Sequence, residues 1–400
     1  MKILIVPGND WVSGPKQYLN DIAEILGKKH EIYVWRFELF VHRKPFKKKI
    51  ENVKILNLPS IHSDNLLMYY IANLIPHSVL YARVVRRLGI DVVVALNLVP
   101  ALWAFLLSPP GTLRVYGLQD YFPESASVYY KSYPKVLRRI LESWALLVNK
   151  LGVRLADLTI SPCFSLVDVA GKMGCKRNFF LPNGVDTNLF SPSKPDESLK
   201  EKLGTTKNTL VFFGLIEKWL DFDTMFDGLR ILKKEFPDLK LLIVGSPLTD
   251  YAKDLEKMIA DRDLTDSVVM TGFVPEEHVP RYLSLGSACL MPYRVDEFSG
   301  KVRLPIKFYI YSASGKPILS VLLPEVKRTG AKHIFYYHDG VSFAKSASLI
   351  FKNEELRKSM EHFSRDFAMD FDYSRLAQKC ETILEQERLR KKRKRTDTGN

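Results

Sequence analysis

A lysine lies at the expected N-terminus of a short helix in the second half of the chain, where it could bind an anion. Residues 304–319 read LPIKFYIYSASGKPIL, and the pattern predicts a helix, its end and the next strand. Pro305 fits the first turn of that helix, where its missing N–H costs nothing. The amides of the first turn, the helix dipole and Lys307 together would make an anion site, with a diphosphate as a natural occupant. Ordinary helix capping beside a solvated lysine is the alternative interpretation.

Glycines at the ends of predicted strands mark further candidate ligand loops. In open parallel sheets, ligands bind at the carboxyl ends of the strands. Gly14 lies between the first predicted strand and its helix, Gly214 ends a strand shortly before Lys218, and Gly245 ends the next strand. A single glycine at a strand end is common in such folds, so the prediction of a ligand site depends on these glycines taken together.

These residues need a scaffold of parallel strands, and the sequence predicts one in each half. Short apolar runs alternate with amphipathic stretches, which is typical of βαβ units. The predicted strands are 2–6, 31–37, 53–58, 91–96, 112–118, 157–161 and 179–183, then 209–214, 239–245, 268–272, 287–293, 317–321 and 333–337. We therefore expect an α/β protein with two Rossmann-like, doubly wound domains that face a cleft.

The expected boundaries follow from composition. We predict an N-terminal domain over 1–185, a C-terminal domain over 186–374, and a final helix with a basic tail over 375–400. The segment 184–207 is rich in Pro, Ser, Asp and Lys and is expected to be a linker. The final helix, expected at about 375–390, could cross back to the first domain.

Charge and cysteine content limit the class of protein. The 400 residues carry a net charge of +14, and 46% of them are hydrophobic. Seven positive charges lie in RLRKKRKR (388–395), which is typical of a disordered arm. The other basic clusters indicate a polyanionic partner, either an anionic membrane or nucleic acid. Four scattered cysteines without CxxC spacing indicate reduced thiols and a cytoplasmic protein, soluble or peripheral at the membrane.

Several motifs of the second half resemble retaining glycosyltransferases of family 4, which have the GT-B fold. LPNGVDTNLFSP (181–192) is similar to their interdomain segment, and VFFGLIEKWLDFDTMFDGL (211–229) to the start of their donor-binding domain. GFVPEEHVPRYLSLGSACLMPY (272–293) is similar to their base-binding loop, and SASGKP (312–317) to a segment of the same domain. The first half resembles them in layout, through the Ser-Gly loop and GLQDYFPE (117–124).

The resemblance implies a donor, an acceptor and residue roles. A nucleotide-diphosphate sugar would bind the C-terminal domain, and the N-terminal domain would bind the acceptor, without a cofactor or a metal ion. Catalytic or phosphate-binding roles fall on Asp120, Lys218 and Lys307. Donor-binding roles fall on Gly14, Gly214, Gly245, Phe273, Val274, Pro305 and Ile306. Asp120 could instead cap a helix or form an Asx turn before Pro123.

The chain departs from the family at the ribose and phosphate positions. Ile310 and Val302 stand where the family has a pair of glutamates, and isoleucine accepts no hydrogen bond from a ribose. Leu215 replaces an arginine, and Lys218 is displaced from the usual lysine position. These losses favour a rival hypothesis, a non-catalytic GT-B-like binding or scaffold protein.

The remaining predictions concern binding partners and motifs that only resemble metal sites. The stretch 129–152 has Tyr, Trp, Lys and Arg around an apolar stripe, so we expect either an interfacial helix or a buried helix with a charged outer face. The former favours a glycolipid or other glycan acceptor at an anionic membrane, whereas nucleic acid is not expected. DFD at 221–223 should cap a helix, DFD at 370–372 should be on the surface, and no histidine has metal-ligand spacing.

Overall fold

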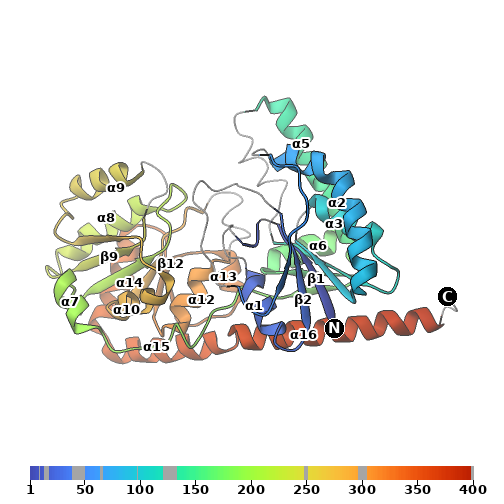
Figure 1. Ribbon diagram of the computed structural model, residues 1–400. Helices are drawn as coiled ribbons and strands as arrows, with labels where there is room; N and C mark the ends of the chain where they lie inside the picture. The colour runs from blue at the N-terminus through green and yellow to red at the C-terminus, as the bar shows by residue number, and fades with distance from the viewer. Residues whose placement is uncertain are drawn as a thin grey trace. The chain divides into compact units, whose positions relative to one another are not determined.

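The computed structural model describes residues 1–397 except 9, 13–17, 38–49, 64–65, 97, 120–132, 247–250 and 296–303. It consists of two compact α/β units, each with its own parallel sheet (Figure 1). The first unit contains Met1–Pro182 together with Tyr373–Asn400, and the second contains Asn183–Asp372. Both sheets appear where the alternating apolar pattern predicts them, so the doubly wound α/β class is confirmed.

The first unit has a seven-stranded parallel sheet in the order β3-β2-β1-β4-β5-β6-β7. Its strands are β1 Lys2–Val6, β2 Glu31–Trp35, β3 Lys54–Leu56, β4 Val92–Ala95, β5 Leu113–Gly117, β6 Leu158–Ser161 and β7 Asn178–Phe180. Its helices are α1 Tyr18–Leu26, α2 Leu66–Leu88, α3 Leu98–Leu107, α5 Lys135–Leu155, α6 Phe164–Met173 and α16 Tyr373–Asp397. Alternate residues of each strand point to opposite faces of the sheet.

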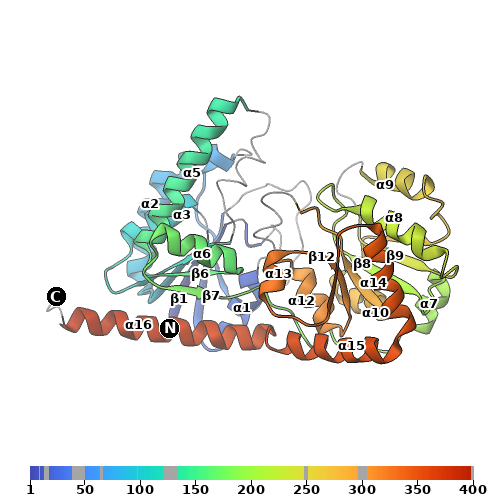
Figure 2. The same ribbon diagram turned by 180° about the vertical axis from the view of Figure 1, so that it is seen from behind.

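Two helical layers cover this sheet. On one face, Ile3 and Ile5 belong to a core cluster with residues of α1 and α16, such as Leu19 and Leu384. On the other face, the ring centroid of Trp35 lies 5.5 Å from that of Trp103 on α3. Helix α3 packs between α2 and α5 on this side, so these three helices form one layer (Figures 1 and 2).

Helix α16 is longer than predicted and includes most of the basic tail. Nη2 of Arg388 lies 2.8 Å from Oδ1 of Asp91, and Nζ of Lys391 lies 2.6 Å from Oδ2 of Asp157. The prediction of a disordered arm over 388–395 is therefore wrong, because acidic side chains of the first unit hold this segment in a helix. Residues 375–400 belong to the first unit and do not form a separate part.

The second unit has a six-stranded parallel sheet in the order β10-β9-β8-β11-β12-β13. Its strands are β8 Thr209–Phe213, β9 Lys240–Val244, β10 Val268–Gly272, β11 Ala288–Met291, β12 Ile318–Val321 and β13 Ile334–Tyr337. Its helices are α7 Glu197–Leu203, α8 Phe222–Lys233, α9 Tyr251–Ala260, α10 Val279–Ser284, α12 Ile306–Ala313, α13 Pro324–Arg328, α14 Gly340–Lys352 and α15 Glu354–Met369, with a 3₁₀ turn η1 Glu276–His278.

The segment expected to be a linker is part of the second unit. Val185 forms a parallel bridge with Asp372, and the Thr187 hydroxyl donates a 2.7 Å hydrogen bond to Oδ2 of the same aspartate. Phe190 is buried, and residues 197–203 form α7. The polar composition of 184–207 thus serves capping and side-chain contacts. In the DFD motif at 370–372, Asp370 is exposed as expected, whereas Asp372 is partly buried and accepts the hydrogen bond from Thr187.

The chain passes from the first unit to the second between residues 182 and 183, and returns between residues 372 and 373. Both boundaries lie a few residues before the expected ones at 185/186 and 374/375. None of the described helices combines the length and the apolar composition that crossing a bilayer requires.

Candidate functional site

Two glycines at the carboxyl ends of β8 and β9 allow a close approach of main chain and side chain. Gly214 has φ of +132° and Gly245 has φ of +151°, a region that disfavours other residues. A Cβ on Gly245 would lie 2.0 Å from the carbonyl oxygen of Gly214. A Cβ on Gly214 would lie 2.5 Å from Cε and 2.8 Å from Nζ of Lys307. The space of the missing side chain at Gly214 is therefore filled by the lysine.

Aromatic rings hold the ammonium group of Lys307 at this edge of the sheet. Its Nζ lies 4.1 Å from the ring centroid of Phe212 and 5.5 Å from that of Tyr293. Such contacts attract a cation through the negative face of the ring. The buried Phe212 is the penultimate residue of β8, and Tyr293 follows β11. The lysine is therefore placed where these two neighbouring strands end.

The first turn of α12 supplies amides next to this lysine. Pro305 occupies the N-cap position, one residue before the expected first turn, with φ of −69° and ψ of 142°. No described side chain caps this helix. The first amides of an α-helix lack intrahelical acceptors and attract anions. The side chain of Lys307 and a helix N-terminus without a side-chain cap thus meet beside Gly214.

Tyr311 fixes α12 against the end of β8, a role that the sequence did not reveal. Its hydroxyl accepts a 2.8 Å hydrogen bond from the amide of Phe213 and lies 3.2 Å from the carbonyl oxygen of the same residue, to which it can donate. Burial raises the pKa of Tyr311 well above its ordinary value, so the hydroxyl keeps its proton. Since Lys307 is one turn earlier on α12, this contact fixes the lysine over Gly214.

The loop after Gly214 is tied to the segment after β11. The amide of Asp221 donates a 2.7 Å hydrogen bond to the carbonyl of Pro292, and Leu220 bridges Tyr293. Lys218 is exposed on this loop, with Nζ 5.9 Å from the ring centroid of Tyr251. The structure therefore places Lys218 beside α9, and Lys307 is the lysine that contacts Gly214.

Asp221 accepts the amide of Thr224 as the N-cap of α8, so the prediction that this DFD motif caps a helix is confirmed. Asp223 pairs with Arg262 and Arg294.

Phe273 and Val274 leave the sheet beside Gly245, because Gly245 and Gly272 form an antiparallel bridge. Phe273 is 78% exposed and Val274 is partly buried. Ile306 at the start of α12 is also exposed, whereas Ile310 is buried. This edge thus combines a basic group with exposed apolar side chains.

The GKP lysine has a structural role. Nζ of Lys316 donates to the carbonyls of Ser284 and Gly286, at 3.2 and 2.7 Å. Gly315, with φ of +67°, lies between the C-cap Ser314 of α12 and this lysine.

Gly14 and Asp120 lie outside the described residues, as do Val302 and the basic residues Lys301 and Arg303.

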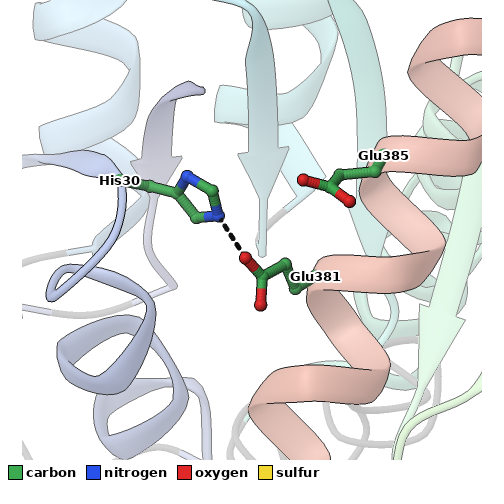
Figure 3. Close-up of side chains that lie close together, drawn as sticks. All are labelled: His30, Glu381 and Glu385. Atoms are coloured by element: carbon green, nitrogen blue, oxygen red, sulfur yellow. Dashed lines mark hydrogen bonds and ion pairs between the residues drawn. The ribbon is translucent and has the colours of Figure 1, made fainter.

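One cluster with metal-ligand chemistry lies in the first unit and joins residues that are far apart in sequence. His30, Glu381 and Glu385 offer ligand atoms within 4.8 Å of one another (Figure 3). Nε2 of His30 lies 2.8 Å from Oε1 of Glu381, and Nζ of Lys29 lies 3.3 Å from Oε2. Because Glu381 already has these two partners, we interpret the cluster as an anchor that holds α16 on the turn before β2.

Comparisons with known proteins support the fold of the whole chain and relate the second unit to glycosyltransferases. Residues 207–353 match the family model described as glycosyl transferases group 1. TuaH of Bacillus subtilis, a glycosyltransferase named for teichuronic acid biosynthesis, is 27% identical over 207 residues, which are 51% of this chain and 49% of TuaH. The amylovoran biosynthesis glycosyltransferase AmsK of Erwinia amylovora is 29% identical over 131 residues, 33% of this chain and 31% of AmsK. The chain thus spans half or less of the length of these two curated relatives.

Solved structures extend the likeness of the fold to nearly the whole chain. HepE of Anabaena in complex with UDP has a TM-score of 0.70 and 18% identity, over 96% of this chain and 100% of HepE. The same protein with UDP-glucose has a TM-score of 0.68 and 16% identity over the same shares. The predicted GT-B fold is confirmed, and the match to the group 1 glycosyltransferase model lies within the second unit.

Proposed function

We propose that this protein is a retaining, metal-independent glycosyltransferase that moves a sugar from a nucleotide-diphosphate sugar to a hydroxyl of a glycan or glycolipid. The observation that carries the proposal is the meeting of Lys307, Gly214 and the first turn of α12 at the carboxyl edge of the second sheet. The group 1 match over 207–353 and the HepE complexes with UDP and UDP-glucose support the donor class.

The chemistry expected of this edge is stabilisation of a leaving diphosphate. When the bond between sugar and phosphate breaks, negative charge develops on the diphosphate oxygens. Preorganised donors stabilise such charge because they need no reorientation during the reaction. Main-chain amides at the start of α12 and the Lys307 ammonium group would supply this positive potential. Their position is set by the Tyr311–Phe213 hydrogen bond and by the aromatic rings around the lysine.

The base would stack near Phe273 on the loop after β10. That side chain is 78% exposed, so its ring is accessible to a ligand. Val274 would contact the other edge of the base. Ile310 supplies no acceptor for the ribose, so ribose recognition would depend on other groups of this unit.

A thermal-shift panel followed by a turnover assay tests the proposal. UDP, GDP and ADP, each free and as a sugar conjugate, should include a ligand that raises the melting temperature, because binding to the native state stabilises it. Release of the nucleoside diphosphate with the matching conjugate, and a product anomer identical to that of the donor, would be expected. No shift with any of these ligands would contradict the donor class.

A non-catalytic binding protein is the second candidate. This candidate is favoured by Leu215, which follows Gly214 and is 47% exposed. The family 4 glycosyltransferases that the sequence resembles have an arginine at this position. In that case, a nucleotide-sugar would raise the melting temperature without release of a nucleoside diphosphate, with or without an acceptor preparation.

A further inference from the structure

Helix α5 presents an apolar stripe on the side that faces away from its own unit. Val136, Ile140, Trp144, Leu147 and Leu151 recur at helical spacing and are 41% to 71% exposed. The buried residues Ala145, Val148 and Gly152 are on the other side of the helix. Packing in the unit therefore accounts for one face of α5 and leaves the apolar stripe in solvent.

Helix α2, in the same layer, has a second stripe. Met68, Ile71, Ile75 and Val79 are 45% to 75% exposed, whereas Tyr69, Asn73, His77 and Tyr81 are buried toward the sheet. Isolated exposed apolar residues are normal, but repeated stripes on helices of one layer make a patch that marks an interaction site. We call the outward faces of α2 and α5 the outer helical face.

The charge around the outer helical face selects the partner. Helix α2 has no acidic residue, and its stripe is followed at the same spacing by the exposed Arg83, Arg86 and Arg87. Helix α5 has a single acidic residue, Glu142, which pairs with Arg138, while Lys135 and Arg139 are exposed near its start. A second copy of this chain would bring like charges together. An apolar face bordered by Arg and Lys and containing a Trp suits an anionic lipid surface.

We infer that the outer helical face of α2 and α5 docks the protein on an anionic phospholipid bilayer, with the two stripes in the headgroup region and the arginines on the lipid phosphates. Docking itself needs only this face. Its consequence, that the acceptor hydroxyl reaches the enzyme from the bilayer as part of a lipid, rests on the proposed function.

Vesicle flotation of the full chain tests the docking. Without nucleotide, the protein should float with phosphatidylcholine vesicles that contain phosphatidylglycerol, and binding should weaken as salt is raised. Ile75→Glu and Ile140→Glu change exposed side chains and should each lower the partition coefficient roughly tenfold, through lost apolar contact and added negative charge. Arg86→Gln should lower binding to the anionic vesicles about fivefold and leave binding to pure phosphatidylcholine unchanged.

Matched controls come from exposed apolar residues of the second unit. Leu349 on α14 and Phe363 on α15 are 45% and 42% exposed, so Leu349→Glu and Phe363→Glu change surface hydrophobicity without touching the outer helical face. Both controls should float like the wild type. Thermal unfolding of every variant identifies any that misfolds, and the stripe on the other helix then provides the decisive variant.

Three outcomes would overturn the inference. The first is that the wild type does not float with the anionic vesicles. The second is that the stripe variants float as well as the wild type. The third is that those variants change oligomeric state without a change in lipid binding, which would identify a protein partner. The thermal shift with the nucleotide panel, measured without lipid, separates the two proposals. A lost nucleotide shift with intact flotation counts against the proposed function alone, and the reverse counts against the docking alone.

Discussion

The hydroxyl of Tyr311 lies 2.8 Å from the amide nitrogen of Phe213 and joins the middle of α12 to the end of β8. Lys307 is one helical turn before Tyr311, so this hydrogen bond sets where the ammonium group stands relative to Gly214. A buried tyrosine of the same helix thereby positions the main cation of the candidate site. The relationship separates positioning from binding, and each can be tested by its own substitution.

Tyr311→Phe should destabilise the protein and weaken donor binding together. The change leaves the amide of Phe213 without its acceptor, which costs about 1–2 kcal/mol of the free energy of unfolding. Urea unfolding measures that loss, and nucleotide titration measures the donor affinity. Tyr337→Phe is the matched control, because the buried Tyr337 hydroxyl has no hydrogen-bond partner among the described residues. Loss of donor affinity in both variants alike would contradict the positioning role of Tyr311.

Lys307→Ala should lower donor affinity with little loss of stability. A charge-assisted hydrogen bond contributes about 1.5–3 kcal/mol, so the dissociation constant of the nucleotide should rise roughly tenfold to hundredfold. Lys218→Ala is the comparison, since that lysine is exposed beside Tyr251. We expect a smaller effect there, and isothermal titration should show it. An equal or larger effect at Lys218 would move the phosphate site to the loop after Gly214.

Gly214→Ala should weaken donor binding because the new methyl group occupies the space of the Lys307 side chain. Positive φ adds a backbone cost of about 1 kcal/mol. Gly330→Ala carries a similar backbone cost, because Gly330 has φ of +72°, but a Cβ there would meet nothing within 4 Å. Both variants should lose stability in urea, and only Gly214→Ala should lose nucleotide affinity. Unchanged affinity in Gly214→Ala would show that Lys307 does not hold the donor.

The sequence predicted those elements whose formation depends on residues close together in the chain. Each strand is a short apolar run, and Pro305 with Lys307 marks the helix start within three residues. The role of Tyr311 was missed because its partner is a main-chain amide 98 residues away. The anchor of His30 on Glu381 spans 351 residues, so spacing could not reveal it.

Two errors have a common cause. Residues 184–207 and 388–395 were expected to be a linker and a disordered arm because they are polar. Asp372 accepts a hydrogen bond from Thr187, and Asp157 pairs with Lys391, so distant acidic groups order both segments. Composition alone cannot show a partner that is brought close by the fold.

Acid should weaken the attachment of α16 to the first unit through Asp157. Burial alone raises the pKa of this carboxyl group, but hydrogen bonds from Arg114 and Lys391 outweigh burial and hold the pKa below its ordinary value. Since the folded-state pKa is below that of the unfolded chain, the contribution to stability is fully present above about pH 4 and is lost as pH falls through the folded-state pKa. Urea midpoints between pH 7 and pH 3 should fall, and the fall should be smaller in Asp157→Asn, which is already destabilised at pH 7. Glu385→Gln, a change at an exposed carboxylate of α16, should keep the pH dependence of the wild type. A wild-type slope in Asp157→Asn would show that other carboxylates control the acid response.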